Sequence, residues 1–224
     1  MLVLVFIAVV SVMGRGGSAV NGALPASRPT ATTRPPTVAA STPTPAATTA
    51  STPRYAFPVA GTVSYARTHH DYPATDIIAA CGSAVRAVTD GVVLEVNRTD
   101  VYDAHTDDGA DRGGLFVSLL GDDGVRYYGS HLSAVAAGIN PGVRVKSGQV
   151  LGTTGDSGDA SACHLHFGIS PPCAKQGDWW NQRGTLYPWP YLDSWRAGGQ
   201  KSPVAAVQKW HKSNGCPAKP TVDG

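Results

Sequence analysis

Short apolar segments separated by turn residues run along the chain from residue 55 to about residue 170. The segments are rich in Val and are bounded by Gly, Asp and Asn, which is typical of β-strands joined by tight turns. No segment keeps a long, well-capped apolar period near 3.6 residues, so helices should be few, with at most one short helix around residues 133–137. The predicted strands span residues 84–88, 91–96, 115–120, 125–129, 143–145, 149–152 and 164–169. We therefore expect a mainly antiparallel β fold with short hairpins and long loops.

The chain before residue 55 has a different pattern. Residues 2–13 are almost continuously apolar and small residues follow, as in a secretory signal, although no Lys or Arg precedes the run. This run is shorter than the roughly 20 residues needed to span a membrane, so we expect an exported protein without a stable membrane span. Residues 21–54 consist mainly of Pro, Thr, Ala and Ser, which predicts a disordered linker. The division is therefore a signal-like segment at 1–20, a linker at 21–54 and a folded domain at 55–170.

Residues 171–224 form a further region with a composition of its own. All the tryptophans of the chain lie here, interspersed with Gly and Pro: Trp179, Trp180, Trp189, Trp195 and Trp210. We expect an irregular extension that packs on the β domain. Aromatic rings that cover a small core explain this composition better than a dedicated sugar-stacking platform.

Charge and cysteine content narrow the class of protein. The net charge is only +2, and no cluster of Lys and Arg with interleaved aromatics is present, so nucleic acid is not an expected partner. Four cysteines, Cys81, Cys163, Cys173 and Cys216, lie in the part expected to be exported, which favours two disulfides. Three pairings are open. One of them has a local disulfide between Cys163 and Cys173 and a second disulfide between Cys81 and Cys216.

A histidine pair on the last predicted strand is a candidate for metal chemistry. In a strand, residues i and i+2 project from the same face, so His164 and His166 should point to one side and Leu165 to the other. Rings spaced by about 6 to 7 Å along a strand can share one site, one as a ligand and one beside the metal-bound water. An isolated pair of this kind is weak evidence and needs further partners.

Further partners occur earlier in the chain. His69 and His70 precede Asp76, and Asp76 comes just before an apolar strand start at Ile77. Imidazole and carboxylate both bind zinc at roughly 2.0 to 2.2 Å, and two histidines with one aspartate leave the fourth tetrahedral position for water. His131 ends another predicted strand and can project into the same cleft.

The order of these motifs resembles the lysostaphin/LytM-type zinc metallopeptidases, over about residues 57–169. The shared motifs follow the His–Asp pair and are DGVV at 90–93, YxxHL at 128–132, GxxVxxGQxLG at 142–152, Gly155 and HxHF at 164–167. Several ordered motifs with matching spacing seldom coincide. The resemblance implies a barrel-sandwich β domain of the duplicated hybrid type, a zinc cofactor, and cleavage of the peptides of bacterial peptidoglycan.

The resemblance also implies roles for single residues. Zinc would be held by His70, Asp76 and His166, while His131 and His164 act on the water and the developing oxyanion. In the family the first histidine usually lies four residues before the aspartate, whereas His70 lies six and His69 seven residues before it. An even separation keeps two side chains on one face of an extended segment, which favours His70, with His69 as the alternative.

These features predict a secreted, cell-wall-associated zinc metalloendopeptidase. The alternative is a catalytically inactive LytM-domain protein that binds or activates another cell wall hydrolase, because a fold by itself does not establish activity. Residues 145–152 also resemble a hairpin of biotinyl or lipoyl carrier domains. That function requires a Lys flanked by Met, and Lys146 has Val145 and Ser147 as neighbours.

Overall fold

The computed structural model describes residues 54–173 and 177–220. The predicted signal-like segment and all but the last residue of the predicted linker lie outside this range. Within the described ranges, no helix is both long enough and apolar enough to cross a membrane.

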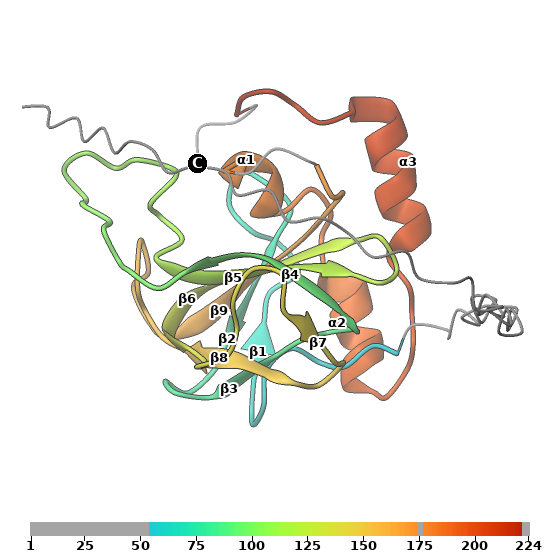
Figure 1. Cartoon of the computed structure of the whole chain (residues 1–224), viewed down its shortest axis with the longest axis horizontal. Coiled ribbons are helices and arrows are strands. Elements are labelled where there is room, and N and C mark those ends of the chain that lie inside the picture. Colours follow the sequence, from blue (N-terminus) through green and yellow to red (C-terminus); the bar gives the residue numbers. More distant parts are fainter. Residues whose placement is uncertain (1–53, 174–176, 221–224) are drawn as a thin grey trace, which may run out of the picture. The chain divides into compact units, whose positions relative to one another are not determined.

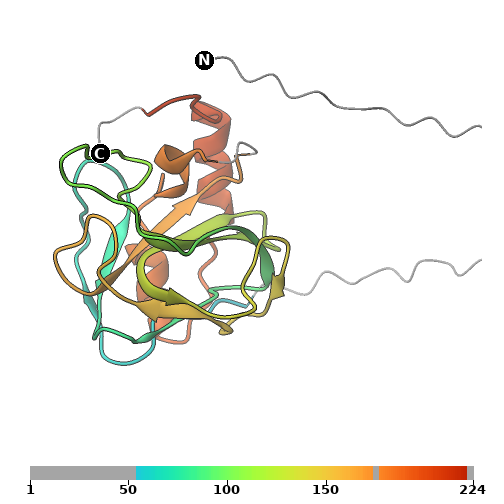
Figure 2. The same cartoon turned by 60° about the vertical axis from the view of Figure 1, so that its left-hand side comes forward.

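A single antiparallel sheet forms the centre of the described chain (Figures 1 and 2). Its strands are β1 (Ser64–Tyr65), β2 (Thr75–Ile78), β3 (Ala84–Arg86), β4 (Gly91–Asn97), β5 (Leu115–Gly121), β6 (Arg126–Val135), β7 (Arg144–Val145), β8 (Val150–Thr154) and β9 (His164–Ser170). The main path is β1-β2-β9-β6-β5-β4-β7. The sheet branches at β6, because β8 pairs with β6 and with β3. The predicted strands and the mainly antiparallel β fold are confirmed.

Alternation along the strands separates the core from the face that carries the histidines. On β9, Leu165, Phe167 and Ile169 belong to the buried apolar core. His164 and His166 therefore project to the other side, as residues i and i+2 of a strand must. On β2, the core residue is Ile77, so its neighbour Asp76 also projects away from the core.

Two predictions about helices were wrong. Residues 133–137 do not form a helix, because β6 continues to Val135 and pairs there with β8. The Trp-rich extension is not irregular throughout, since it contains α1 (Trp179–Gln182), α2 (Trp189–Arg196) and α3 (Val204–Asn214). Pro188 and Pro203 stand immediately before the two longer helices. Proline is well tolerated at a helix start, so residues that indicate a loop in the sequence here begin helices.

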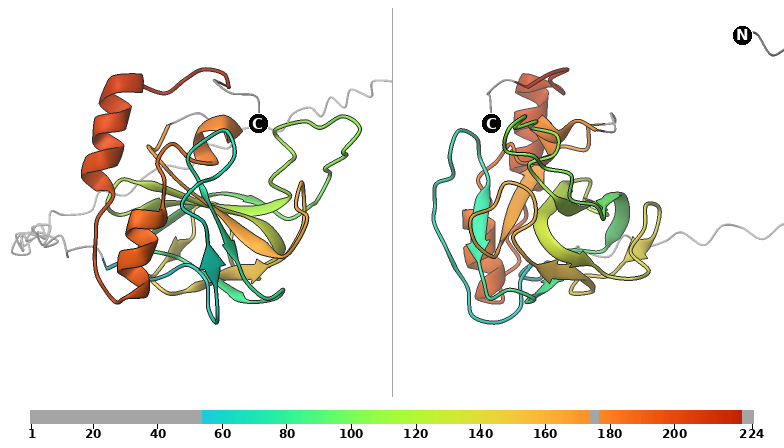
Figure 3. Two further views of the ribbon diagram at one scale, coloured as in Figure 1. Left: turned by 180° about the vertical axis from the view of Figure 1, so that it is seen from behind. Right: turned by 90° about the vertical axis from the view of Figure 1, so that its left-hand side faces the viewer.

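The extension packs on the sheet through aromatic side chains. Trp195 of α2 stacks on Tyr55 with ring centroids 5.2 Å apart, and it also contacts Tyr127 and Phe167. Only 4% of Trp195 is exposed, so this ring covers the core and offers no platform for a ligand. Figures 1 and 3 show α2 and α3 on one side of the molecule and the long loop of residues 98–114 on the opposite side.

Two disulfides join Cys81 to Cys163 and Cys173 to Cys216. The pairing of Cys163 with Cys173 and Cys81 with Cys216, one of the three left open, is therefore wrong. The physical reason lies in the sheet: Ile78 at the end of β2 pairs with His164 at the start of β9. Antiparallel pairing brings Cys81 and Cys163, just beyond these partners, to the same edge.

Removal of the first disulfide should destabilise the fold strongly. The Cys81–Cys163 bond links residues separated by 82 positions. Cross-links that close long loops restrict the unfolded chain, and their loss typically costs about 2 to 5 kcal/mol. The double variant Cys81→Ala/Cys163→Ala should lose stability in this range, measured by urea unfolding at equilibrium. An unchanged unfolding midpoint would contradict this expectation.

Candidate metal and catalytic site

A polar cleft of about 330 Å³ lies on the face of the sheet that carries the histidines. Its lining includes all the candidate site residues: His69, His70, Asp76, His131, His164 and His166. All candidate residues from the sequence are therefore brought to one cleft, although they come from four separate segments of the chain. The walls also include Tyr72, Arg112, Trp179 and Arg183.

The β2–β9 pairing places Asp76 directly opposite His166. His166 Nδ1 lies 3.1 Å from Asp76 Oδ1. Burial raises the pKa of Asp76, but the hydrogen-bonding contact and the charge of His166 lower it more, so that its pKa falls below the usual value. Asp76 is therefore held as a carboxylate, the form that binds a metal ion.

His69 completes this group, and His70 does not. His69 Nε2 lies 3.6 Å from Asp76 Oδ2, and one ligand atom each from His69, Asp76 and His166 lies within 4.8 Å of the others. His70 is exposed and meets the ring of His69 edge-on at 5.0 Å. The spacing argument favoured His70, but it assumed an extended segment. Residues 66–74 form a loop instead, so the alternation of a strand does not apply there.

The surroundings of His166 fit a cation. Its Nε2 lies 2.8 Å from the backbone oxygen of Arg183, which can only accept a hydrogen bond. The other nitrogen faces the carboxylate of Asp76, a second acceptor. A neutral imidazole has one N–H, so both neighbours are satisfied only by an imidazolium or by a cation between Nδ1 and Asp76. Two imidazoles and a carboxylate are a zinc ligand set that leaves one position open.

Burial keeps the His69 ring in the uncharged form that can bind a metal ion. Burial, together with the nearby charge of His166, lowers the pKa of His69 to about 4. At neutral pH this ring is therefore uncharged, which is the form in which imidazole binds metal ions. Tyr72 packs against the ring at a centroid distance of 4.6 Å and fixes its place in the loop.

His131 and His164 stand side by side next to this group, with ring centroids 4.6 Å apart. His131 Nδ1 lies 2.8 Å from the oxygen of Ser157, and His164 Nδ1 lies 2.8 Å from the oxygen of Ala162. In each ring Nδ1 therefore carries the proton, and Nε2 is left as an acceptor. His164 Nε2 is 3.8 Å from Asp76 Oδ1, which places this acceptor beside the metal-ligand group.

The backbone of His131 has a conformation that is rare outside glycine. Its φ angle is 61°, in the left-handed region. The amide of His131 donates to the oxygen of Gly113 over 3.0 Å, and this bond and the ring contact to Ser157 hold the strained conformation. Strained residues of this kind often occur at functional sites. Burial, together with the nearby charge of His166, lowers the pKa of His131 to about 4.

Tyr72 and Arg183 contact the candidate ligands but were not among the predicted site residues. Tyr72 follows the candidate histidines closely, and its position was a usable signal. Arg183 gave no such signal, because it lies in the extension, beyond the last shared motif, and its contact with His166 is made by a backbone atom.

Comparison with known proteins identifies the family. The model of Peptidase family M23 matches residues 58–179. The chain belongs to peptidase family M23. This M23 chain is 37% identical over 87 residues to the glycyl-glycine endopeptidase ALE-1 of Staphylococcus capitis, which is 38% of the chain and 21% of that relative. It thus spans about a fifth of the length of the relative.

A solved structure shares the fold of this M23 chain, and a second one aligns with it less closely. A Ruminococcus gnavus structure assigned as a glycyl-glycine endopeptidase lytM aligns with a TM-score of 0.50 and 24% identity, over 66% of this chain and 63% of that one. The catalytic domain of lysostaphin from Staphylococcus simulans aligns with a TM-score of 0.45 and 24% identity, over 59% and 93% of the two chains. The predicted membership of the lysostaphin/LytM family is confirmed.

Proposed function

We propose that this M23 protein is an exported, zinc-dependent metalloendopeptidase that hydrolyses peptide bonds of bacterial peptidoglycan. The observation that carries the proposal is the convergence of His69, Asp76 and His166 within 4.8 Å, beside two further imidazoles. Membership of a peptidase family and the name of the Staphylococcus capitis relative support the reaction class. The two disulfides support export, since such bonds persist mainly in oxidising compartments.

The ligands would be His69 Nε2, a carboxylate oxygen of Asp76 and His166 Nδ1. When bound there, zinc supplies Lewis acidity that polarises a peptide carbonyl and lowers the pKa of a water molecule towards neutrality. The chain itself contributes the negative charge of Asp76 and the fixed orientation of both rings. The Tyr72 contact holds His69, and the Arg183 carbonyl holds His166.

His164 is placed to act as the general base. Its Nε2 is an acceptor that faces the ligand group, and the carboxylate of Asp76 at 3.8 Å stabilises the ring once it has taken a proton from water. The same ring can then return the proton to the leaving amine. Burial lowers the pKa of His131 to about 4, so this ring is uncharged at neutral pH. Its role would be to accept a hydrogen bond from the attacking water through Nε2 and so hold the water in position.

Digestion of purified peptidoglycan tests the proposal. The protein should release new amino groups without releasing reducing sugar ends, because it cuts peptide and not glycan bonds. A chelator should abolish this release, and added zinc should restore it. Zinc-loaded protein that binds the wall but releases no amines would instead support the non-catalytic role as a partner of another wall hydrolase.

A further inference from the structure

The backbone carbonyl of Arg183 lies directly behind His166. It accepts a hydrogen bond of 2.8 Å from His166 Nε2, in a buried position. This bond fixes the proton on Nε2 and leaves Nδ1 toward Asp76. Arg183 thus determines which nitrogen of His166 faces the proposed metal position, although it lies outside the family-matched region of residues 58–179.

The side chain of Arg183 supports the other histidine indirectly. Its guanidinium carbon lies 3.9 Å from the ring centroid of Tyr72 and 4.8 Å from that of Trp179. Cation–π contacts of this kind are strengthened when the site is shielded from water. Tyr72 in turn packs against His69 at 4.6 Å and against His166 at 5.8 Å. A continuous stack therefore runs from Trp179 through Arg183 and Tyr72 to His69.

The backbone of residues 183–185 packs closely against β9 and against the loop of residues 66–74. A Cβ atom on Gly168 of β9 would lie 2.4 Å from the oxygen of Arg183. A Cβ atom on Gly184, where φ is 141°, would lie 2.2 Å from the oxygen of Pro73. Thr185 donates its amide to the oxygen of Ile169 over 2.9 Å. The backbone after Arg183 is thus pinned between β9 and the loop that carries His69.

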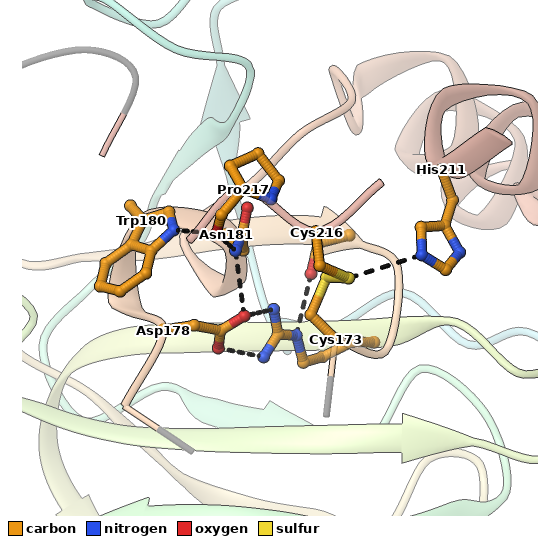
Figure 4. The surroundings of a disulfide bond; sticks show 9 residues. Cys173, Asp178, Trp180, Asn181, His211, Cys216 and Pro217 are labelled. Carbon is orange, nitrogen blue, oxygen red and sulfur yellow. Dashed lines mark hydrogen bonds and ion pairs between the residues drawn. A yellow bond between two sulfur atoms is a disulfide. The ribbon is translucent and has the colours of Figure 1, made fainter. Parts of the chain in front are cut away.

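The helical turn that precedes Arg183 is anchored at a buried ion pair and a disulfide (Figure 4). Asp178 binds the guanidinium of Arg126 through two hydrogen bonds of 2.6 and 3.0 Å, with both side chains almost fully buried. Asn181 and Trp180 each donate to the oxygen of Pro217, next to the Cys173–Cys216 bond. The turn therefore has little freedom to move, and the Arg183 carbonyl has a defined position.

We propose that Arg183 is a positioning residue for the metal site: its carbonyl orients His166, and its guanidinium holds Tyr72 against His69. This inference rests on the proposed zinc site. It gives the C-terminal extension a role in metal binding, because Arg183 contacts His166 directly and His69 through Tyr72. Loss of such supporting contacts typically lowers metal affinity by roughly 10- to 100-fold.

The test compares Arg183→Ala with Arg112→Ala in the full chain. Both arginines line the cleft, but the side chain of Arg112 pairs with Asp107 at the surface. Zinc affinity, measured by competition with a chromophoric chelator, should fall about 10- to 100-fold in Arg183→Ala and stay unchanged in Arg112→Ala. Unfolding of both metal-free variants is followed in parallel. Equal zinc affinity of folded Arg183→Ala and the unsubstituted protein would overturn the role of the guanidinium, because this variant keeps the backbone carbonyl.

A second measurement tests, in the metal-free protein, whether the Arg183 carbonyl orients the His166 ring. Nitrogen NMR of the imidazoles in the metal-free protein should show His166 protonated at Nε2. In Gly168→Ala, whose Cβ would displace the Arg183 oxygen, this signal should lose its protection from solvent exchange. If the unsubstituted protein binds no zinc, the proposed metal site fails, whereas the imidazole spectrum still decides the role of Arg183. A His166 protonated at Nδ1 alone, with no proton on Nε2, in the unsubstituted protein would overturn that role.

Discussion

Replacing His69 with alanine is expected to remove zinc from the protein, and replacing the adjacent His70 is expected to leave the zinc in place. The reason is geometric: His69 Nε2 lies 3.6 Å from Asp76 Oδ2 and its ring 5.0 Å from that of His166, whereas His70 is exposed. Loss of a direct ligand should lower zinc affinity by more than the roughly 10- to 100-fold typical of supporting groups. The measurement is zinc content per folded protein after dialysis, followed by chelator competition.

The two variants control for each other, because they remove the same side chain from neighbouring positions. His166→Ala and Asp76→Ala should behave like His69→Ala. Peptide hydrolysis should follow zinc content in all of them. A His70→Ala variant without zinc, beside a His69→Ala variant that retains it, would refute this ligand set and restore the set that spacing alone favoured.

Much of the β fold and of the site could be predicted because both depend on local patterns. The alternation of β9 places His164 and His166 on one face regardless of the rest of the fold. The ordered motifs likewise marked Asp76 and His131 as candidate site residues before their convergence in the cleft could be seen. Such features are encoded within a few residues of each other, so a single sequence is sufficient to find them.

The remaining features depend on contacts between distant segments. His69, the proposed first ligand, lies in a loop, where side-chain direction follows from packing against Tyr72 and not from a repeat. The cysteine pairing follows from which strands are neighbours, and the β2–β9 pairing was not known from the sequence. The contribution of Arg183 depends on a backbone carbonyl, which any residue type has. No local pattern could have indicated it.

Replacing His131 with alanine is expected to slow peptide hydrolysis while leaving zinc bound. His131 lies beside His164 at 4.6 Å but outside the group of metal-ligand atoms. Misplacement of a reacting group by about 1 Å can cost about 10²-fold in rate, so loss of the ring that holds the attacking water should lower kcat by about this factor. Removal of a general base costs about 10²- to 10⁴-fold, so His164→Ala should be impaired at least as strongly. The measurement is kcat on peptidoglycan fragments, with zinc content determined in the same samples.

His105→Ala is a matched control for this experiment. His105 lies in the exposed loop, where its ring contacts Asp103, and it does not line the cleft. Its replacement should leave both kcat and zinc content unchanged. If His131→Ala loses zinc, His131 is a ligand and the open coordination position assigned to water is instead taken by the protein. If its kcat stays within about twofold of the unsubstituted protein, a change of less than 1 kcal/mol in the barrier, His131 has no part in the reaction.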